Sequence, residues 1–213
     1  MTAAPAAVLF DVDGVLLDST AVHRRVWDAW SLSHGLDPET VWPLTFGRRP
    51  ENTVADAAPH LDPVAERRVL DALLAREHHA IRPLPGAASL LGSLSRTPWA
   101  IVTSNTRPFV EPHFTTTGLP LPTVRVYGND VVNPKPSPDA YTLAATRLAV
   151  PPTSCLVIED APAGVTAGLA AGCTVIGLTT THSATELAHA HLRMAALTDV
   201  HDYLVDRGVL GLP

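Results

Sequence analysis

The chain has 213 residues, of which 46% are hydrophobic and 17% charged, so it can bury the core of one large domain or of a domain with a smaller insert. Its formal net charge of −6 argues against a general nucleic-acid-binding protein, which would carry a basic face, and we expect no nucleic-acid partner. The two cysteines, Cys155 and Cys173, lie in apolar strand-like stretches without a CxxC pair, which favours buried thiols in a reducing compartment.

No stretch of the sequence predicts a membrane anchor. Residues 1–7 lack a basic start and are too few to hold the hydrophobic segment of a signal peptide before Asp11. The long uncharged stretch 161–185 contains glycines, a proline and many threonines, which is typical of a helix, a turn and a strand. We therefore expect a cytoplasmic protein with no membrane partner, and a monomer.

The first predicted element is a buried strand near the start of the chain. The apolar stretch Val8-Leu9-Phe10 ends in two carboxylates, Asp11 and Asp13, which are followed by a glycine. In open α/β sheets the carboxyl ends of the strands are where ligands bind. Carboxylates before a glycine also occur in ordinary turns, so the motif needs companions before it indicates a site.

Residues 18–82 differ from the rest of the chain in their sequence pattern, which is mostly helical. Residues 20–34 predict an amphipathic helix and residues 63–79 a charged one, and a loop with the adjacent arginines Arg48 and Arg49 lies between them. Nothing in this range resembles a buried strand. The predicted division is a core formed by residues 1–17 and 83–213, with residues 18–82 as an inserted helical domain.

From residue 83 onward, apolar stretches alternate with helical patterns. Strands are predicted at 99–102, 123–127, 155–158 and 173–178, and helices at 87–94, 137–149 and 162–171, with Ser137 as the N-cap of the second helix. This alternation predicts an α/β fold with a Rossmann-like three-layer core around a parallel sheet.

Polar groups follow several of these strands and should meet at one edge of the sheet. They are Asp11 and Asp13, the stretch Thr103-Ser104-Asn105, Lys135, and the pair Glu159-Asp160. Clustered carboxylates raise one another's pKa unless a cation lies among them, and their oxygens suit Mg²⁺. A threonine, the amides after it and a lysine offer the donors and the positive charge for an anion. Together these groups describe a phosphoryl-transfer site.

Asp11 and Asp13 can have different tasks, because they occupy different positions where the chain leaves the strand and are not equivalent. One carboxylate can attack phosphorus and form an aspartyl-phosphate. The other can protonate the leaving alkoxide and then take a proton from water.

Four stretches resemble, in order, the four motifs of the haloacid dehalogenase superfamily. They are Asp11-Val12-Asp13-Gly14-Val15, Val102-Thr103-Ser104-Asn105, Lys135-Pro136-Ser137-Pro138 and Ile158-Glu159-Asp160-Ala161-Pro162-Ala163-Gly164. The resemblance implies that Asp11 is the nucleophile and Asp13 the general acid and base. It also implies phosphate binding by Thr103, Ser104, Asn105 and Lys135, and Mg²⁺ binding by Asp11, the backbone carbonyl of Asp13, and Asp160, with Glu159 on the metal or directly behind its ligands.

The insert 18–82 resembles the small α-helical (C1) cap of this superfamily, which would close over the site and exclude water. In it, His23, Arg48 and Arg49 are candidates for substrate contact. Each also has a structural alternative, since His23 can pack against Trp27 and an arginine pair is often a solvated charge.

Two positions depart from common superfamily patterns. Dehalogenases of this superfamily lack the second aspartate, so Asp13 argues for phosphate chemistry. Pro134 stands where relatives usually have glycine, so the loop 134–136 should be stiff, which leaves the placement of Lys135 open.

Taken singly, the other candidates also have structural alternatives. Lys135 could be a surface lysine, Thr103 the end of a strand and Asn105 a turn former, while Glu159 or Asp160 could cap the following helix. Four motifs in order favour the functional interpretation.

The predicted activity is Mg²⁺-dependent hydrolysis of a small phosphate monoester through an aspartyl-phosphate. Similarity of Gly47-Arg48-Arg49 and of the stretches 159–164 and 178–182 to phosphatases of deoxyhexose and glycerol phosphates indicates a sugar or polyol phosphate. The alternative is a β-phosphoglucomutase-like phosphotransferase, suggested by Gly14-Val15, Asp18-Ser19, His23 and Trp27. A non-catalytic binding protein of the same fold is a third possibility.

Overall fold

A six-stranded parallel sheet forms the centre of the protein, and the computed structural model describes residues 4–210, apart from the side chain of residue 78. The strands lie in the order β5-β4-β1-β6-β7-β8, and every neighbouring pair is parallel. Their bounds are β1 Ala7–Phe10, β4 Trp99–Val102, β5 Val124–Val126, β6 Cys155–Glu159, β7 Thr174–Leu178 and β8 Leu192–Met194. The strand order changes direction beside β1, which is where sheets of this type bind ligands.

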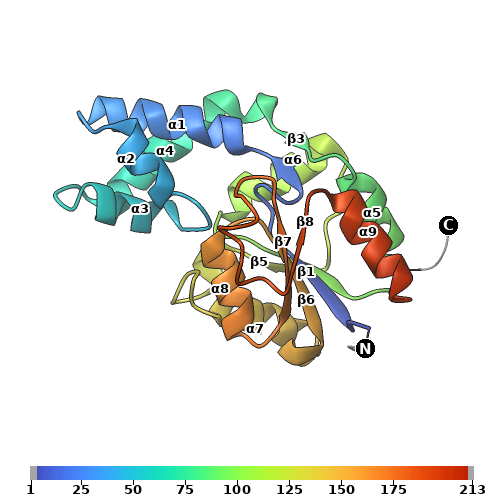
Figure 1. Cartoon of the computed structure of the whole chain (residues 1–213). Coiled ribbons are helices and arrows are strands. Elements are labelled where there is room, and N and C mark those ends of the chain that lie inside the picture. Colours follow the sequence, from blue (N-terminus) through green and yellow to red (C-terminus); the bar gives the residue numbers. More distant parts are fainter. Residues whose placement is uncertain (1–3, 211–213) are drawn as a thin grey trace.

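Helices cover both faces of the sheet and form the outer layers of a three-layer core (Figure 1), which confirms the predicted α/β class. One face carries α7 Asp139–Arg147 and α8 Pro162–Ala170; the other carries α5 Ala87–Ser93, α6 Arg107–Thr117 and α9 Leu197–Asp206. Residues 1–3 and 211–213 of the predicted core lie outside the described residues.

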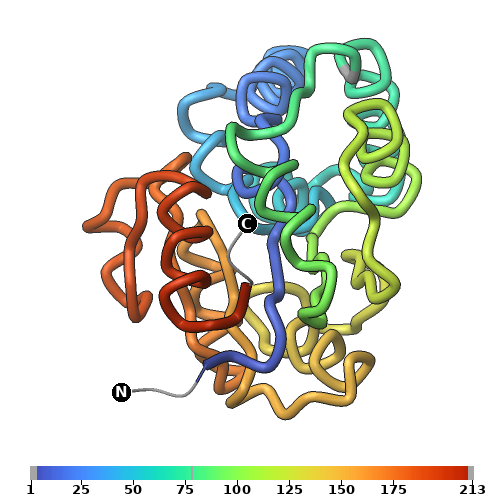
Figure 2. Tube along the Cα trace, turned by 90° about the vertical axis from the view of Figure 1, so that its right-hand side faces the viewer, coloured from blue at the N-terminus to red at the C-terminus, as the bar shows by residue number. Residues whose placement is uncertain are grey.

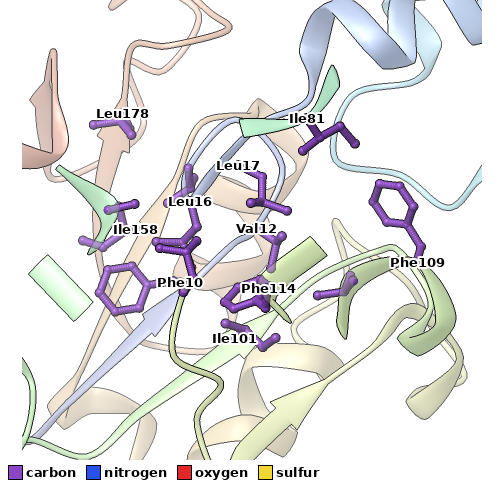
Figure 3. Packing of buried hydrophobic residues seen from close by; sticks show 14 of the residues in the cluster. Phe10, Val12, Leu16, Leu17, Ile81, Ile101, Phe109, Phe114, Ile158 and Leu178 are labelled. Atoms are coloured by element: carbon purple, nitrogen blue, oxygen red, sulfur yellow. The ribbon is translucent and has the colours of Figure 1, made fainter. Parts of the chain in front are cut away.

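The side chains of β1 alternate between these two layers. Val8 and Phe10 belong to the buried cluster on the side of α5, α6 and α9, whereas Leu9 belongs to the cluster on the side of α7 and α8. Figure 3 shows Phe10 in one buried cluster with Phe114 of α6 and Ile101 of β4. Because both faces are covered, β1 is an unbroken apolar stretch, and polar side chains begin only where the strand ends.

The helices of the insert lie between two short strands, β2 Leu17–Asp18 and β3 Arg82–Pro83. These strands pair antiparallel, so the chain leaves and re-enters the core side by side. The helices are α1 Thr20–Ser33, α2 Pro38–Val41, α3 Pro50–Ala57 and α4 Pro63–Glu77. Figure 2 shows β1 (blue) running toward the insert, which lies at the carboxyl end of this strand. The exact division into core and insert domains stays a prediction.

Short 3-10 helices complete the connections. They are η1 Trp42–Leu44, η2 His78–Ala80, η3 Gly128–Asp130 and η4 Pro152–Ser154. Both cysteines are buried and free, as expected. Within residues 4–210, no helix combines the length and the apolar character that crossing a membrane requires.

In the core, helices α6 and α9 and strand β8 were not predicted from the sequence. Helix α6 contains Pro112, and a proline inside a helix hides the helical pattern because it normally breaks one. Strand β8 lies at the edge of the sheet with Leu192 and Arg193 exposed, so it lacks the apolar run of a buried strand. Helix α9 follows this strand and packs on α5.

The predicted N-cap of α7 is wrong. The helix begins at Asp139 with Pro138 as its N-cap residue, and Ser137 lies before it. The Ser137 hydroxyl donates to the Asp139 carboxylate at 2.7 Å instead of binding a backbone amide of the first turn. The side chain that should have capped the helix therefore stabilises the loop that precedes it.

Candidate active site

The carboxyl ends of three neighbouring strands bring the predicted site residues together. Asp11 follows β1, Thr103 follows β4, and Glu159 ends β6. Backbone pairing continues past two of these strand ends, because the Asp11 amide donates to the Ile158 carbonyl and the Thr103 amide to the Val126 carbonyl, both at 3.0 Å. The sheet register therefore determines where these side chains begin.

Lys135 reaches the centre of this group from the loop between β5 and α7, and it is buried. Its Nζ donates to Asp11 Oδ1 at 2.5 Å, to Glu159 Oε1 at 2.6 Å and to the Val102 carbonyl at 3.1 Å. The Lys135–Pro136 peptide bond is cis. The contacts of Lys135 place it between two carboxylates, a placement that the sequence alone left open.

Both oxygens of the Glu159 carboxylate are fully used as acceptors. Oε1 accepts from Lys135 and from the hydroxyl of Tyr141 at 2.8 Å, while Oε2 accepts the backbone amides of Asp160 at 3.0 Å and Ala161 at 3.2 Å. A Cβ at position 164 would overlap this carboxylate, so only glycine allows α8 to pass so close. Glu159 therefore anchors Lys135, and Tyr141 is a contact that the sequence analysis missed.

Asp11, Glu159 and Asp160 each offer a carboxylate oxygen, and these oxygens lie within 4.8 Å of one another. Burial raises the pKa of Asp11 to about 7 against the opposing charge of Lys135, and the charge of Glu159 raises it further. Burial and the charges of Glu159 and Asp11 raise the pKa of Asp160 well above its usual value. Hard oxygen donors that repel one another suit a divalent cation such as Mg²⁺. Because the acceptors of Glu159 are occupied, Asp11 and Asp160 are the carboxylates best able to hold it.

Gly14 makes room for this group. Its φ is +78°, and a Cβ there would overlap the Asp160 carboxylate. The Thr181 hydroxyl also donates to that carboxylate, from the loop after β7. Asp160 is therefore held between two turns of the core.

The surroundings of Asp13 lower its pKa, whereas those of Asp11 and Asp160 raise theirs. Oδ1 accepts the Ser19 hydroxyl at 2.6 Å and lies 3.2 Å from His23 Nε2, and Oδ2 accepts the Asn105 amide at 2.8 Å. Burial disfavours ionisation of Asp13, but the hydrogen bond and charge of His23 and the hydrogen bonds of Ser19 and Asn105 outweigh it and lower the pKa to about 2. Two carboxylates with opposite pKa shifts at one site suit two different tasks in a reaction.

A cavity lies between the strand ends and the insert. The core side is lined by Asp11, Asp13, Asp160, Thr103, Ser104 and Asn105. From the insert, His23 and Arg48 line it together with the rings of Trp27, Trp42 and Phe46. A small ligand in this cavity would meet the carboxylates of the core on one side and, on the other, the aromatic residues of the insert together with His23 and Arg48.

The two arginines of the insert loop have different surroundings. Arg48 lines the cavity, and its guanidinium donates to Asp56 at 2.6 Å. Arg49 is not among the residues that line the cavity; it donates to the carbonyls of Val131 at 2.5 Å and Val132 at 3.3 Å. Its contact is therefore with the core, and its contact with a substrate stays a prediction.

Further contacts join the insert to the core around the cavity. The Ser104 hydroxyl donates to the Gly47 carbonyl at 2.8 Å, and the ring centroids of Phe46 and His182 lie 4.5 Å apart. A Cβ at Gly47 would lie 3.2 Å from that of Ala161, so this turn of the insert packs directly on the start of α8. The insert thus covers the cavity in this structure.

Comparisons with known proteins relate this arrangement to one family. A family model described as haloacid dehalogenase-like hydrolase matches residues 5–172. Hexitol phosphatase A from Escherichia coli (strain K12) is 42% identical over 175 residues, which cover 80% of this chain and 81% of that protein. Validoxylamine A 7'-phosphate phosphatase from Streptomyces hygroscopicus subsp. limoneus is 35% identical over 204 residues, which cover 90% of this chain and 94% of that protein. The crystal structure of β-phosphoglucomutase from Clostridium difficile is similar in fold, with a TM-score of 0.84 over 95% of this chain and 96% of that chain, at 19% identity.

Proposed function

The chain belongs to the haloacid dehalogenase-like hydrolase family, and we propose that it is a Mg²⁺-dependent phosphatase that hydrolyses a small sugar or polyol phosphate. The family resemblance of the four sequence motifs is confirmed by this match, and the named phosphatases among its relatives support a phosphoric monoester hydrolase. The observation that carries the proposal is the pair Asp11 and Asp13 at one cavity, the first bound to Lys135 and the second held by three other side chains.

In the first step, a carboxylate oxygen of Asp11 attacks phosphorus, and the bond from phosphorus to the leaving oxygen breaks. Lys135 stays cationic at neutral pH: burial alone would lower its pKa, but the charges of Asp11 and Glu159 raise it above its usual value. Its ammonium group can therefore neutralise the phosphoryl oxygens beside the nucleophile. A bound Mg²⁺ would supply further positive charge to these oxygens.

Asp13 then serves as the proton carrier. Its low pKa keeps the carboxylate ionised at neutral pH, which is the form that the second step requires, because there it takes a proton from the water that hydrolyses the aspartyl-phosphate. In the first step the leaving alkoxide needs a proton. For Asp13 to supply this proton, the substrate must replace one of the three hydrogen-bond donors around the carboxylate, so that Asp13 can become protonated. Otherwise the phosphate ester must bind with the proton already on it.

The residues around the acidic group fit a magnesium ion. Asp11 and Asp160 offer carboxylate oxygens, and burial together with the charges of neighbouring carboxylates raises their pKa values; a bound cation would stabilise the ionised form of both groups. The backbone carbonyl of Asp13 completes the proposed protein ligands. Lys135 and the backbone amides hold Glu159, so we propose that it supports the site from behind the metal ligands.

We propose that residues 18–82 act as a cap that selects the alcohol part of the substrate. The rings of Trp27, Trp42 and Phe46 offer apolar surfaces for the carbon chain, and His23 and Arg48 offer polar groups. The substrates in the names of the two phosphatase relatives, a hexitol phosphate and validoxylamine A 7'-phosphate, support such an alcohol. A cytoplasmic location and a monomeric state stay predictions.

One observation favours the phosphatase over the phosphotransferase. A mutase that passes through a sugar bisphosphate needs a second cationic site for the distal phosphate. Among the described residues that line the cavity, Arg48 is the only arginine, and it is paired with Asp56, while Arg49 binds two carbonyls of the core. The fold likeness to β-phosphoglucomutase does not distinguish the two activities.

The test is a panel of sugar, polyol and nucleotide phosphates with Mg²⁺, assayed for free phosphate. We expect release from sugar or polyol phosphates, loss of release in EDTA and recovery when Mg²⁺ is restored. Asp11→Asn should lower turnover to background, because the amide cannot act as the nucleophile. Formation of glucose 6-phosphate from glucose 1-phosphate without free phosphate would favour the mutase instead. Turnover of nucleotide monophosphates alone would contradict the proposed substrate class.

A further inference from the structure

Tyr141 touches both members of the ion pair behind the nucleophile, although it does not line the cavity. It lies on α7, six residues after Lys135, and is fully buried. Its hydroxyl donates to Glu159 Oε1 at 2.8 Å, and its ring centroid lies 5.0 Å from Lys135 Nζ. One side chain thus contacts the anion through its oxygen and the cation through its ring face.

These contacts complete the set of groups that orient Glu159. Three of its four acceptor positions are filled by Lys135 and two backbone amides, and the Tyr141 hydroxyl fills the fourth. Glu159 and Tyr141 are fully buried and Lys135 is nearly so. Water therefore has little access to replace a lost hydrogen bond, and an unfilled acceptor would leave the carboxylate free to turn.

The direction of Glu159 in turn determines where Lys135 lies. The Lys135 ammonium has three acceptors, and two of them, Glu159 Oε1 and the Val102 carbonyl, belong to residues that do not line the cavity. The third is Asp11 Oδ1 at 2.5 Å. If Glu159 turns, the ammonium loses one of its two carboxylate partners, and its distance to the nucleophile is less well determined.

We propose that Tyr141 is a positioning residue for phosphoryl transfer, which keeps Lys135 beside Asp11 by fixing Glu159 through its hydroxyl and covering the ammonium with its ring. This inference rests on the proposed phosphatase function. Tyr141 acts through Glu159 and Lys135, and it contacts neither the substrate nor the reacting atoms.

The test compares Tyr141→Phe with a matched control, Tyr127→Phe. Tyr127 is also buried, and its hydroxyl donates to a carboxylate, Glu111, at the same distance of 2.8 Å, but outside the cavity. Each substitution keeps the ring and removes one oxygen from a Tyr–Glu hydrogen bond. The Glu111 side chain is 29% exposed, so water can replace the lost hydrogen bond there, and Tyr141→Phe should lose more thermal stability than Tyr127→Phe. Turnover is therefore compared at a temperature at which thermal denaturation shows both variants to be folded.

For Tyr141→Phe we expect kcat to fall about tenfold, because a misplaced ammonium stabilises the transition state less, while KM stays within about threefold. Its affinity for inorganic phosphate, measured by calorimetry with Mg²⁺ present, should weaken severalfold. Tyr127→Phe should keep the kcat and the phosphate affinity of the parent. Parent-like kcat in Tyr141→Phe, or an equal loss in both variants, would overturn the inference while the phosphatase function stands. A parent enzyme that releases phosphate from no ester would overturn both.

Discussion

The ion pair between Arg48 and Asp56 predicts how the enzyme treats a second charge on its substrate. Arg48 lines the cavity on the side of the insert, and Asp56 neutralises it through a contact of 2.6 Å. Asp56→Asn keeps the shape of the side chain but removes its charge. The freed guanidinium should then attract an anionic group on the alcohol part of the substrate.

The magnitude follows from the exposure of the pair. The side chain of Asp56 is 54% exposed and that of Arg48 is 28% exposed, so solvent screens the interaction. Two unit charges about 4 Å apart in water-like surroundings interact by about 1 kcal/mol, which corresponds to about fivefold in a rate ratio. We therefore expect a change of about fivefold in relative kcat/KM between a neutral and an anionic substrate.

Glycerol 3-phosphate and 3-phosphoglycerate form a suitable pair, because a carboxylate in the second replaces a hydroxymethyl group in the first. The parent enzyme should prefer glycerol 3-phosphate, and Asp56→Asn should move the ratio of kcat/KM values toward 3-phosphoglycerate. Adding Arg48→Gln should restore the parental ratio. An unchanged ratio in Asp56→Asn, or a shift that persists in the double variant, would refute the role given to the pair.

Two further predictions concern the two carboxylate environments. Gly164→Ala should lower kcat/KM at least tenfold and reduce the melting temperature, because the added Cβ would displace Glu159. The control is Gly92→Ala in α5, where the added Cβ meets open space, and it should raise the melting temperature slightly. Activity assays and thermal denaturation test both expectations. Asp13 has a pKa of about 2 in the folded protein against 3.8 ordinarily, so its contribution to stability is present above about pH 4 and is lost as the pH falls toward 2. Asn105→Ala removes one of its donors and should raise that pKa, so acid unfolding followed by circular dichroism should begin at a higher pH; an unchanged midpoint would contradict the hydrogen bond to Asp13.

Much of the fold was predictable because buried parallel strands carry a strong local signal. The apolar stretches of β1, β4 and β6 end directly at Asp11, Thr103 and Glu159, so the strand ends and the site candidates came from one pattern. Helix α6 escaped prediction because Pro112 lies within it, and β8 because an edge strand needs no apolar run. Local sequence patterns do not predict a helix or strand that is stabilised by contacts with distant parts of the chain.

Tyr141 shows the same limit at the site. Tyr141 is fully buried on α7, and the sequence analysis assigned it no role. Its hydrogen bond to Glu159 joins residues 18 positions apart that meet only because α7 packs on the sheet. The aromatic residue six positions after the predicted phosphate-binding lysine was the only signal available for it.

The sequence by itself determined which chemical groups the site contains and the order in which the chain supplies them. A strand pattern and its terminal polar residues are adjacent in the chain, so local physical chemistry suffices to identify them. Only the tertiary structure decided which of these groups bind to one another. It placed Lys135 between Asp11 and Glu159, filled the acceptors of Glu159, and separated Arg48 in the cavity from Arg49 on the core. The contacts of Arg49 join residues 82 and 83 positions apart, and such pairings depend on how the whole chain packs.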